Sequence, residues 1–202
     1  MWNWLVRDWQ WPSATLFAAV FLTAFLPLVA LSAGLLLTLI YVQLPVYMLH
    51  QFEEHRGDRF RLYINRTIGH GKEALTPAAT FWINSLGVWL VDLLALYLAW
   101  LIHPAAGLAT GYLAVVNAVP HIGMAIRNRQ YNPGLTTAVT LLLPIGLWCV
   151  IAVGSSASWQ AHLVGLAVAI GVHVAIVVYV AKRLIRLKDQ RATPSIMTPT
   201  RG

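Results

Sequence analysis

The chain has 202 residues, of which 58% are hydrophobic and only 10% are charged. Soluble domains carry roughly 25% charged residues, so this composition excludes a soluble globular protein and indicates an integral membrane protein. Lys and Arg outnumber Asp and Glu by 14 to 7. The single cysteine, Cys149, excludes an intrachain disulfide and a thiolate metal cluster.

Apolar segments follow one another along the chain and predict an all-α bundle of six transmembrane helices. Residues 13–55 must hold two of them, because one helix of that length would far exceed the hydrocarbon core, which is about 30 Å thick. The small residues of LSAG, at 31–34, place the break there. The predicted spans are residues 13–31, 35–55, 77–102, 107–128, 133–154 and 159–183. Residues 1–188 are predicted to form one membrane domain, and residues 189–202 a flexible cytoplasmic tail.

The basic residues predict how this bundle is oriented. If both termini lie on one side, all fourteen Lys and Arg residues fall on that side, which the positive-inside rule makes cytoplasmic. The positive charge is then topological, and we expect contacts with membrane lipids and no nucleic-acid partner. Tryptophans near the start fit an interfacial aromatic belt on the same side: Trp2, Trp4, Trp9 and Trp11. The expected location is the inner membrane, as a multi-pass protein.

A cleavable signal peptide is the competing interpretation of residues 1–33. The sequence LVALSA has small residues in suitable places for cleavage. The apolar stretch before it is long for a signal peptide, and the start carries only one arginine, Arg7, beside Asp8. We therefore predict that residues 1–33 are retained.

The second predicted helix ends in HQFEEH, residues 50–55. At about 100° per residue, His50, Glu53 and Glu54 share a face, whereas His55 points away. Carboxylates are unfavourable at a helix C-terminus, and each charge in hydrocarbon costs about 2.5–3.5 kcal/mol or more. A cation must offset them. One candidate is a bound metal or shared proton, and the other is an interfacial salt-bridge cluster with Arg56, Arg59 and Arg61.

A second motif, NAVPH, places Asn117 and His121 four residues apart on one helix face. Pro120 between them kinks the helix, and Asn117 could be no more than an interhelical hydrogen-bonding residue. His50 and His121 lie about 9–10 Å from the cytoplasmic end of their helices, and so does Asn84 on the third helix. Three helices therefore place polar residues in one layer, which is the predicted site.

The third motif, YNPGLTT at 131–137, begins the fifth predicted helix. Asn132 is predicted as its N-cap and Pro133 as its first helical residue, so that free amides and the positive dipole end point at the polar layer. Gly134 permits close backbone approach. Tyr131 could supply a phenol to a ligand or to a proton relay. A plain helix start is an equally good interpretation of this segment.

The remaining polar residues are weaker candidates. His70 is expected to be solvated in a basic loop. Asp92 lies about 22 Å from the cytoplasmic side, too far to join the polar layer. His173 is most simply an interhelical hydrogen-bonding residue.

HQFEE, NAVPH and YNPG resemble, in this order, the HxxEE, NxxxH and YxPG signatures of the HXXEE-domain membrane family, over approximately residues 35–155. The flanking QLPVYMLHQFEEHRGDRF is similar to one bacterial subgroup. The family has no established reaction, and the resemblance favours an enzyme. It implies that the site is formed by the signature positions His50, Glu53, Glu54, Asn117, His121, Tyr131, Pro133 and Gly134.

The candidate metal ligands are His50, Glu53, Glu54 and His121. Imidazoles and carboxylates without thiolates suit a divalent iron, manganese or zinc ion. One ion is expected, because the paired Glu-x-x-His motifs of di-iron bundles do not occur. The candidate catalytic residues are Glu53, Glu54, Asn117 and Tyr131, with the two glutamates dividing the roles of ligand and general base in an order that the sequence leaves open.

The leading hypothesis is a metal-dependent intramembrane enzyme, a hydrolase or an oxidoreductase, that acts on a lipophilic small molecule from the cytoplasmic leaflet. A transport or proton-relay protein that uses the same residues is the second hypothesis, and a structural membrane subunit is the third. The metal hypothesis predicts that His50, Glu54 and His121 converge, with their nitrogen and oxygen atoms about 3–4 Å apart. It also predicts that Asn117 and Tyr131 lie close enough to contact this group.

Overall fold

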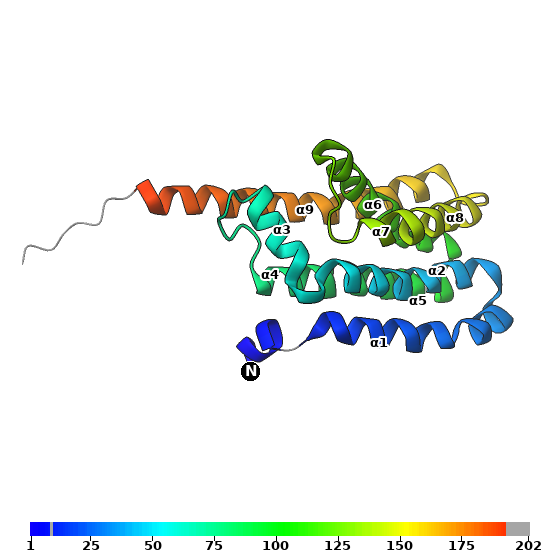
Figure 1. Ribbon diagram of the computed structural model, residues 1–202. Coiled ribbons are helices and arrows are strands. Elements are labelled where there is room, and N and C mark those ends of the chain that lie inside the picture. Colours follow the sequence, from blue (N-terminus) through cyan, green and yellow to red (C-terminus); the bar gives the residue numbers. More distant parts are fainter. Residues whose placement is uncertain (9, 193–202) are drawn as a thin grey trace, which may run out of the picture.

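The computed structural model describes residues 1–8 and 10–192, and these are helical with no strand among them (Figure 1). The helices are α1 (Trp11–Ala24), α2 (Leu26–His55), α3 (Arg59–Thr67), α4 (Pro77–Asn84), α5 (Leu90–Leu101), α6 (Leu108–Asn128), α7 (Leu135–Thr137), α8 (Leu143–Gly154) and α9 (Trp159–Ala192). Single 3-10 or π turns extend or join them: η1 (Trp4–Asp8), η2 (Arg56–Asp58), η3 (Ser85–Trp89), η4 (Pro104–Gly107) and η5 (Ala138–Leu142).

Within the described residues, five continuous helical segments are long and apolar enough to cross a membrane. They are Leu26–Thr67, Pro77–Leu101, Pro104–Asn128, Leu135–Gly154 and Trp159–Asp189. The all-helical architecture that the sequence predicts is therefore confirmed, and the apolar segments are those of a membrane protein.

The first two predicted spans form a helical hairpin. Gly34 inside α2 has φ 73° and ψ 178°, a conformation that breaks the helix and that glycine adopts readily. The chain turns back there, so that residues 35–55 lie beside α1 (Figure 1). The Tyr41 hydroxyl donates a 2.7 Å hydrogen bond to the Leu22 carbonyl across this hairpin. The predicted break at 31–34 is confirmed at its last residue.

Helix α6 lies at the centre of the bundle and packs against both α8 and α9, whereas α2 packs against α5 and α8. Leu113, Ala114 and Ala118 of α6 join a core cluster with α2 and η5, and all three are fully buried. Ala114 and Ala118 let the helix axes approach closely, as small residues do in membrane bundles. This close packing brings α2, α6 and the start of α7 together at one level.

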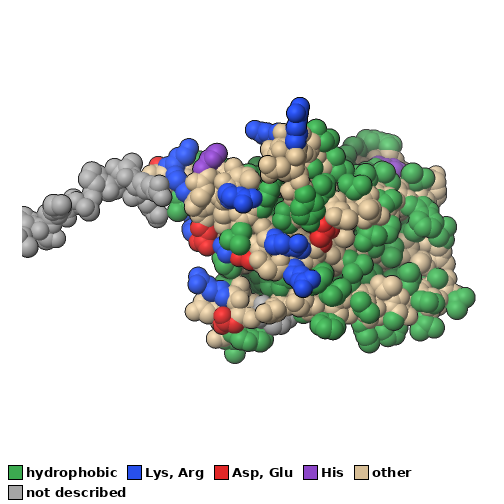
Figure 2. Space-filling view, viewed as in Figure 1, with side chains coloured by type: hydrophobic (Ala, Val, Ile, Leu, Met, Phe, Trp, Pro, Cys, Tyr) green, Lys and Arg blue, Asp and Glu red, His purple; other side chains and the backbone are tan. Residues whose placement is uncertain are grey.

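Charged side chains gather at one end of the molecule (Figure 2). In the view of Figures 1 and 2, Lys, Arg, Asp and Glu cluster where the N-terminus, α3 and the last part of α9 lie, and the opposite end is mostly hydrophobic. Large apolar side chains such as Leu31, Ile151 and Val164 are more than 60% exposed along the helices. Such a surface is suited to lipid contact.

Two features differ from the predictions: the surroundings of Trp11 and the end of the last helix. Trp11 is only 6% exposed and packs against His55 and Phe81, so its ring lies inside the bundle and not on its surface. Trp2 and Trp4 are exposed. Helix α9 runs to Ala192, beyond the predicted end at residue 183. Of the tail predicted over 189–202, residues 189–192 are therefore helical, and residues 193–202 lie outside the described residues, as does Trp9.

Candidate metal centre

Three side chains from two helices converge in the interior near the charged end. His50 and Glu54 lie one turn apart on α2, and His121 faces them from α6. The Glu54 carboxylate is 3.7 Å from His50 Nε2 and 3.5 Å from His121 Nε2. One ligand atom of each residue lies within 4.8 Å of the other two, and all three residues are buried. The predicted convergence of these three residues is confirmed.

Asn132 holds the His121 ring in one orientation. Its Nδ2 donates to the His121 carbonyl at 2.8 Å, which leaves its Oδ1 to accept from His121 Nδ1 at 2.8 Å. Since a neutral imidazole carries one N–H, the Nε2 that faces Glu54 keeps a free lone pair. Asn132 is fully buried in this role. The prediction that it is an N-cap is wrong, because its side-chain oxygen is used by His121 and the cap position falls on Gly134.

Thr137 orients the His50 ring in the same way, with Nδ1 carrying the hydrogen and Nε2 facing the centre. The Thr137 hydroxyl donates to Glu53 Oε2 at 2.5 Å, because a carboxylate can only accept. Its oxygen therefore accepts from His50 Nδ1 at 2.9 Å. The opposite nitrogen, His50 Nε2, has a lone pair directed toward Glu54 and Asn117. Carboxylate partners that orient a ligand histidine in this way, here through a hydroxyl, are typical of metal sites.

Glu53 lies beside the group of three and does not join it. Its carboxylate accepts from the backbone amides of Thr136 and Thr137 at 3.2 and 2.7 Å, and from the Tyr131 hydroxyl at 2.7 Å. These amides are the free donors at the start of the helical segment Leu135–Gly154, and a helix N-terminus favours an anion. We predicted free amides pointing at the polar layer, and the structure confirms them.

The distribution of bonds distinguishes the two glutamates. The Glu53 carboxylate is hydrogen-bonded to backbone amides at the start of a helix, whereas the Glu54 carboxylate lies among imidazoles. Both glutamates were predicted as candidate ligands, and only Glu54 is in the group that could hold an ion. The physical reason is the 100° that separates adjacent residues on a helix, which turns Glu53 toward α7 and Glu54 toward α6.

His55 also contacts the centre. Its Nε2 lies 3.0 Å from Glu54 Oε2, and its ring packs on Trp11 with centroids 5.0 Å apart. The expectation that His55 points away from the site is therefore wrong. The chain leaves α-helical geometry at Arg56, and this brings the last side chain of α2 back against its neighbour. His55 Nδ1 is buried without a hydrogen-bond partner among the described residues.

The arginine salt-bridge cluster does not form. It was the other candidate source of positive charge for the carboxylates. Arg61 pairs with Asp58 and Glu73, and Arg59 donates to the backbone carbonyls of Arg56 and Glu53. In the described part of the chain, the basic side chains next to the Glu54 carboxylate are imidazoles only, and these carry a charge only when protonated. The carboxylate that projects toward α6 is therefore surrounded by groups that can also bind a metal.

Gly134 brings the loop before α7 against both ligand histidines. A Cβ at this position would lie 2.8 Å from His121 Cε1 and 2.8 Å from His50 Cε1. Its φ of +93° is a conformation that other residues rarely adopt. The glycine of the third motif thus has a structural reason, and Pro133 before it is buried.

Asn117 extends the polar layer to α9. Its Nδ2 lies 2.9 Å from His50 Nε2, and its Oδ1 lies 3.1 Å from Nε2 of His173. The interhelical role that was predicted for His173 is confirmed. On another side, Gln51 donates to Asn84 at 2.9 Å, which joins α2 to α4 in the same layer.

Other candidates lie further out. Tyr131 is 52% exposed and reaches the centre only through Glu53. Burial and its hydrogen bond to the Glu53 carboxylate raise the pKa of the Tyr131 phenol, so it keeps its proton and donates it. His70 is exposed in its loop, and Asp92 is buried elsewhere on α5. Neither belongs to the group of three.

A cavity of about 680 Å³ begins at this centre and extends between α4, α6 and α9. Aliphatic side chains form most of its wall. The polar side chains that line it include those of Glu54, His55, Thr80, Asn84, Asn117, His121 and His173. The volume falls in the range of about 300–1,000 Å³ that is usual for pockets that bury small ligands.

Sequence reasoning missed Thr137, Gln51 and the contact of His55. Thr137 stood in the third motif, and a hydroxyl in the first turn of a helix is a signal for a polar partner. Gln51 lies between the two ligand positions of α2, so the helix periodicity alone indicated a buried polar side chain there. The role of His55 had no such signal, because it depends on how the chain leaves α2.

The fold and the centre together define a helical protein of the membrane type with a buried two-histidine, one-glutamate group. The family described as "Protein of unknown function with HXXEE motif" matches residues 41–149, more than half of the chain. The chain belongs to this family, and the resemblance seen in the three motifs is confirmed. No curated protein and no solved structure matches the chain.

Proposed function

We propose that the protein is a metal-dependent enzyme of the membrane that acts on a lipophilic substrate. The observation that carries this proposal is the buried group of His50, Glu54 and His121, of which Glu54 and His121 line a largely apolar cavity. A buried group of ligand type beside a cavity is the usual arrangement of a catalytic site. The substrate would enter the cavity with its hydrocarbon part against the aliphatic wall.

The three side chains fit a divalent metal ion. Metal bonds to imidazole and carboxylate are about 2.0–2.2 Å long, so ligands at near-tetrahedral angles lie about 3.4 Å apart. The two histidines have their Nδ1 hydrogens directed to Asn132 and Thr137, which leaves both Nε2 lone pairs for an ion. Zinc and iron(II) both use two histidines with one carboxylate, and manganese tolerates the same donors. Such an ion would supply Lewis-acid chemistry and open coordination positions.

The surrounding residues have separate roles in this proposal. Glu54 is the carboxylate ligand, and Glu53 with Thr137 holds the His50 ring in its ligand orientation. Asn117, whose Nδ2 contacts His50 Nε2, would bind a polar group of the substrate when His50 serves as a metal ligand. Tyr131 holds Glu53 from the loop side. The aliphatic wall of the cavity would exclude bulk water from the reacting group.

The membrane arrangement proposed with this function has six spans and cytoplasmic termini in the inner membrane. The hairpin at Gly34 supports two crossings in residues 11–55, and the gathering of charges at one end supports a common side for both termini. The centre then lies in the cytoplasmic half of the bilayer. A reporter fused after Gly202 that works only in the cytoplasm is the expected result, and a periplasmic signal contradicts the six-span arrangement.

Elemental analysis of the purified protein tests the metal directly. We expect about one Fe, Mn or Zn ion per chain after purification without chelators. The matched variants are His121→Ala, which removes a ligand, and His173→Ala, which removes a neighbouring half-buried imidazole. Metal lost in the first variant and kept in the second supports the proposal. A wild-type protein that stays metal-free when it is purified and titrated with all three ions contradicts it.

One observation favours a second candidate, a proton-relay or transport protein. A chain of hydrogen bonds runs from Glu53 through Thr137, His50 and Asn117 to His173, and so crosses from α2 to α9. Groups of this kind conduct protons in membrane proteins. Proton flux into protein-containing vesicles that His173→Ala abolishes, together with the absence of metal, would favour this function over the enzyme.

A further inference from the structure

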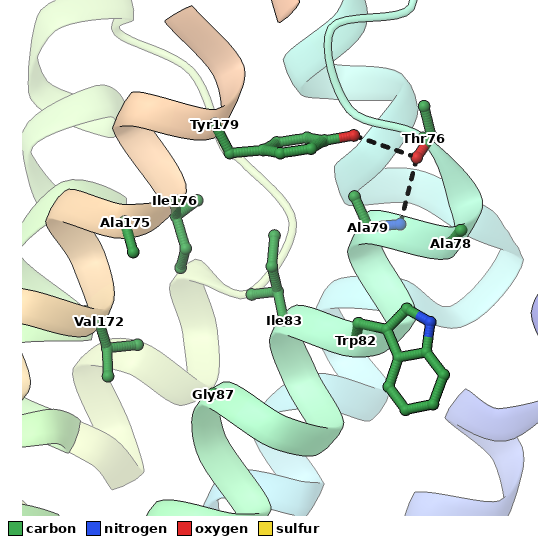
Figure 3. A pocket seen from close by; sticks show the side chains of 10 residues that line it. All are labelled: Thr76, Ala78, Ala79, Trp82, Ile83, Gly87, Val172, Ala175, Ile176 and Tyr179. Atoms are coloured by element: carbon green, nitrogen blue, oxygen red, sulfur yellow. Dashed lines mark hydrogen bonds between the residues drawn. The ribbon is translucent and has the colours of Figure 1, made fainter. Parts of the chain in front are cut away.

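A second hollow adjoins the cavity on the outside of the bundle. It is a groove of about 520 Å³ between α9 and the segment formed by α4 and η3 (Figure 3). Small residues in its lining leave space for the groove, among them Ala79, Gly87 and Ala175. Helix α9 packs mainly on α6, and this leaves its other side separated from α4.

The groove and the cavity share a thin wall. Ile83, Val172 and Ile176 line both of them. In Figure 3, Ile83 extends from α4 and Ile176 from α9 toward the same space. Rotamer changes of such aliphatic side chains are enough to join the two hollows, and no polar contact has to be broken there.

One hydrogen bond crosses the groove at its charged end. The Tyr179 hydroxyl on α9 lies 3.3 Å from the Thr76 hydroxyl at the start of α4 (Figure 3). A single exposed hydrogen bond contributes little net stability, so it can open and close easily. Nearby, Arg183 pairs with Glu73 at 3.7 Å, which places a guanidinium beside the same opening.

The face of α9 that lines the groove changes character along its length. Val172, Ala175, Ile176 and Tyr179 follow the spacing of one helix face and line the groove. The same spacing continues into Lys182, Arg183 and Arg186. An apolar stripe therefore passes directly into a basic stripe on one face of a single helix.

We propose that this groove is the lateral route by which a long-chain lipid with an anionic head group reaches the centre. The apolar stripe would contact the hydrocarbon chain, and Lys182 with Arg186 would contact the head group, because basic residues next to apolar surface attract anionic lipids. The chain would pass between Ile83 and Ile176 into the cavity. This inference rests on the proposed function, because it names the substrate class for the same centre.

Photolabelling in phosphatidylcholine vesicles tests the route. The probes are palmitic acid with a diazirine at mid-chain and the corresponding uncharged alcohol. We expect palmitate to label residues 76–87 and 172–179, and also residues 116–121 of the cavity, with the alcohol labelling at least about fivefold less. Lys182→Gln combined with Arg186→Gln should lower palmitate labelling to the level of the alcohol.

Two tryptophan variants of α9 form the matched pair. Ala175→Trp fills the groove and should reduce labelling at least about fivefold, whereas Val178→Trp places the same bulk on an exposed position outside both hollows. Equal labelling of both variants, labelling spread over all exposed helices, or equal labelling by palmitate and the alcohol overturns the proposal. So does a labelled groove with an unlabelled cavity.

The same measurement after chelator treatment separates this inference from the proposed function. Labelling of the groove and cavity does not need a metal, so specific labelling of a protein that never binds metal leaves the lipid route standing and removes the enzyme proposal. Stoichiometric metal together with non-specific labelling would remove the lipid route and leave the enzyme proposal standing.

Discussion

Helix α2 carries two buried polar regions at different depths, and they are built in opposite ways. Near the charged end, the carboxylate of Glu54 and the rings of His50 and His121 all have partners. About three turns earlier, Gln43 faces the bundle interior with its Oε1 unpartnered, and both oxygens of buried Asp92 on α5 are unpartnered among the described residues.

The two deeper residues, Gln43 and Asp92, lie at a similar level on neighbouring helices. Gln51 and Asn84 are hydrogen-bonded between these antiparallel segments. Gln43 and Asp92 each lie about two turns from that bond, in opposite chain directions, which brings them to a common level. Three acceptor oxygens with no donor are costly in a membrane interior. A neutral carboxylic acid at Asp92 that donates to Gln43 removes most of this cost.

The two regions differ in the positive charge that each one needs. The deeper pair needs only one proton. The upper centre has inward lone pairs on two imidazoles and a carboxylate between them, an arrangement that a proton satisfies only in part and a metal ion satisfies fully. The four predictions that follow test this contrast, from the largest expected effect to the smallest.

The largest effect is expected on removal of a ligand. Glu54→Gln and His121→Ala should each lower metal affinity by more than about 100-fold, because loss of outer-shell partners alone costs about 10–100-fold. Metal titration followed by elemental analysis measures this. Full metal occupancy in Glu54→Gln at wild-type affinity would show that the upper region is satisfied by protons, as the deeper one is.

Loss of the residue that orients His50 should have an intermediate effect. Thr137→Val keeps the shape of the side chain and removes the link between His50 Nδ1 and Glu53. We expect metal affinity to fall about 10–100-fold, the range for outer-shell partners. Thr137→Ser is the matched control and should stay within about threefold of wild type, since it retains the hydroxyl. Equal affinities in both variants would remove the orienting role.

The deeper region should respond to loss of a donor and not to loss of charge. Asp92→Asn supplies an amide that can donate to Gln43, so its unfolding free energy should stay within about 1 kcal/mol of wild type. Asp92→Ala leaves the Gln43 oxygen without a donor and should lose about 1–3 kcal/mol. Unfolding in mixed detergent micelles compares the two. An Asn variant as unstable as the Ala variant would indicate an ionised Asp92 paired with a bound cation.

The smallest effect is expected at the arginines beyond α2. Arg59→Gln removes donors to two backbone carbonyls and leaves every contact of Glu54 in place. We expect a loss of less than about 1 kcal/mol in stability and unchanged metal content. A thermal melt and elemental analysis provide both values. A large loss of stability in Arg59→Gln, together with a wild-type protein that contains no metal, would instead support the salt-bridge cluster as the source of positive charge.

Helix periodicity explains why much of the centre could be predicted. His50 and Glu54 are four residues apart, and so are Asn117 and His121, so each pair lies on one face whatever surrounds it. Equal distances from the helix ends placed these faces at one depth. The same reasoning failed for Asn132 and Pro133, because capping rules consider a helix start alone, and here a buried imidazole uses the Asn132 side chain.

The sequence by itself determined the membrane class, the helical hairpin at Gly34, the common depth of the polar residues and the residue types of the centre. These follow from composition, segment length and helix phase, which are local properties. Tertiary packing was needed to show that Glu53 turns to the start of α7 and leaves the ligand group, that Thr137 and Asn132 orient the two rings, and that a cavity opens beside them. Those outcomes depend on how far each helix is rotated about its axis and how closely it packs, and residues distant in the chain set both.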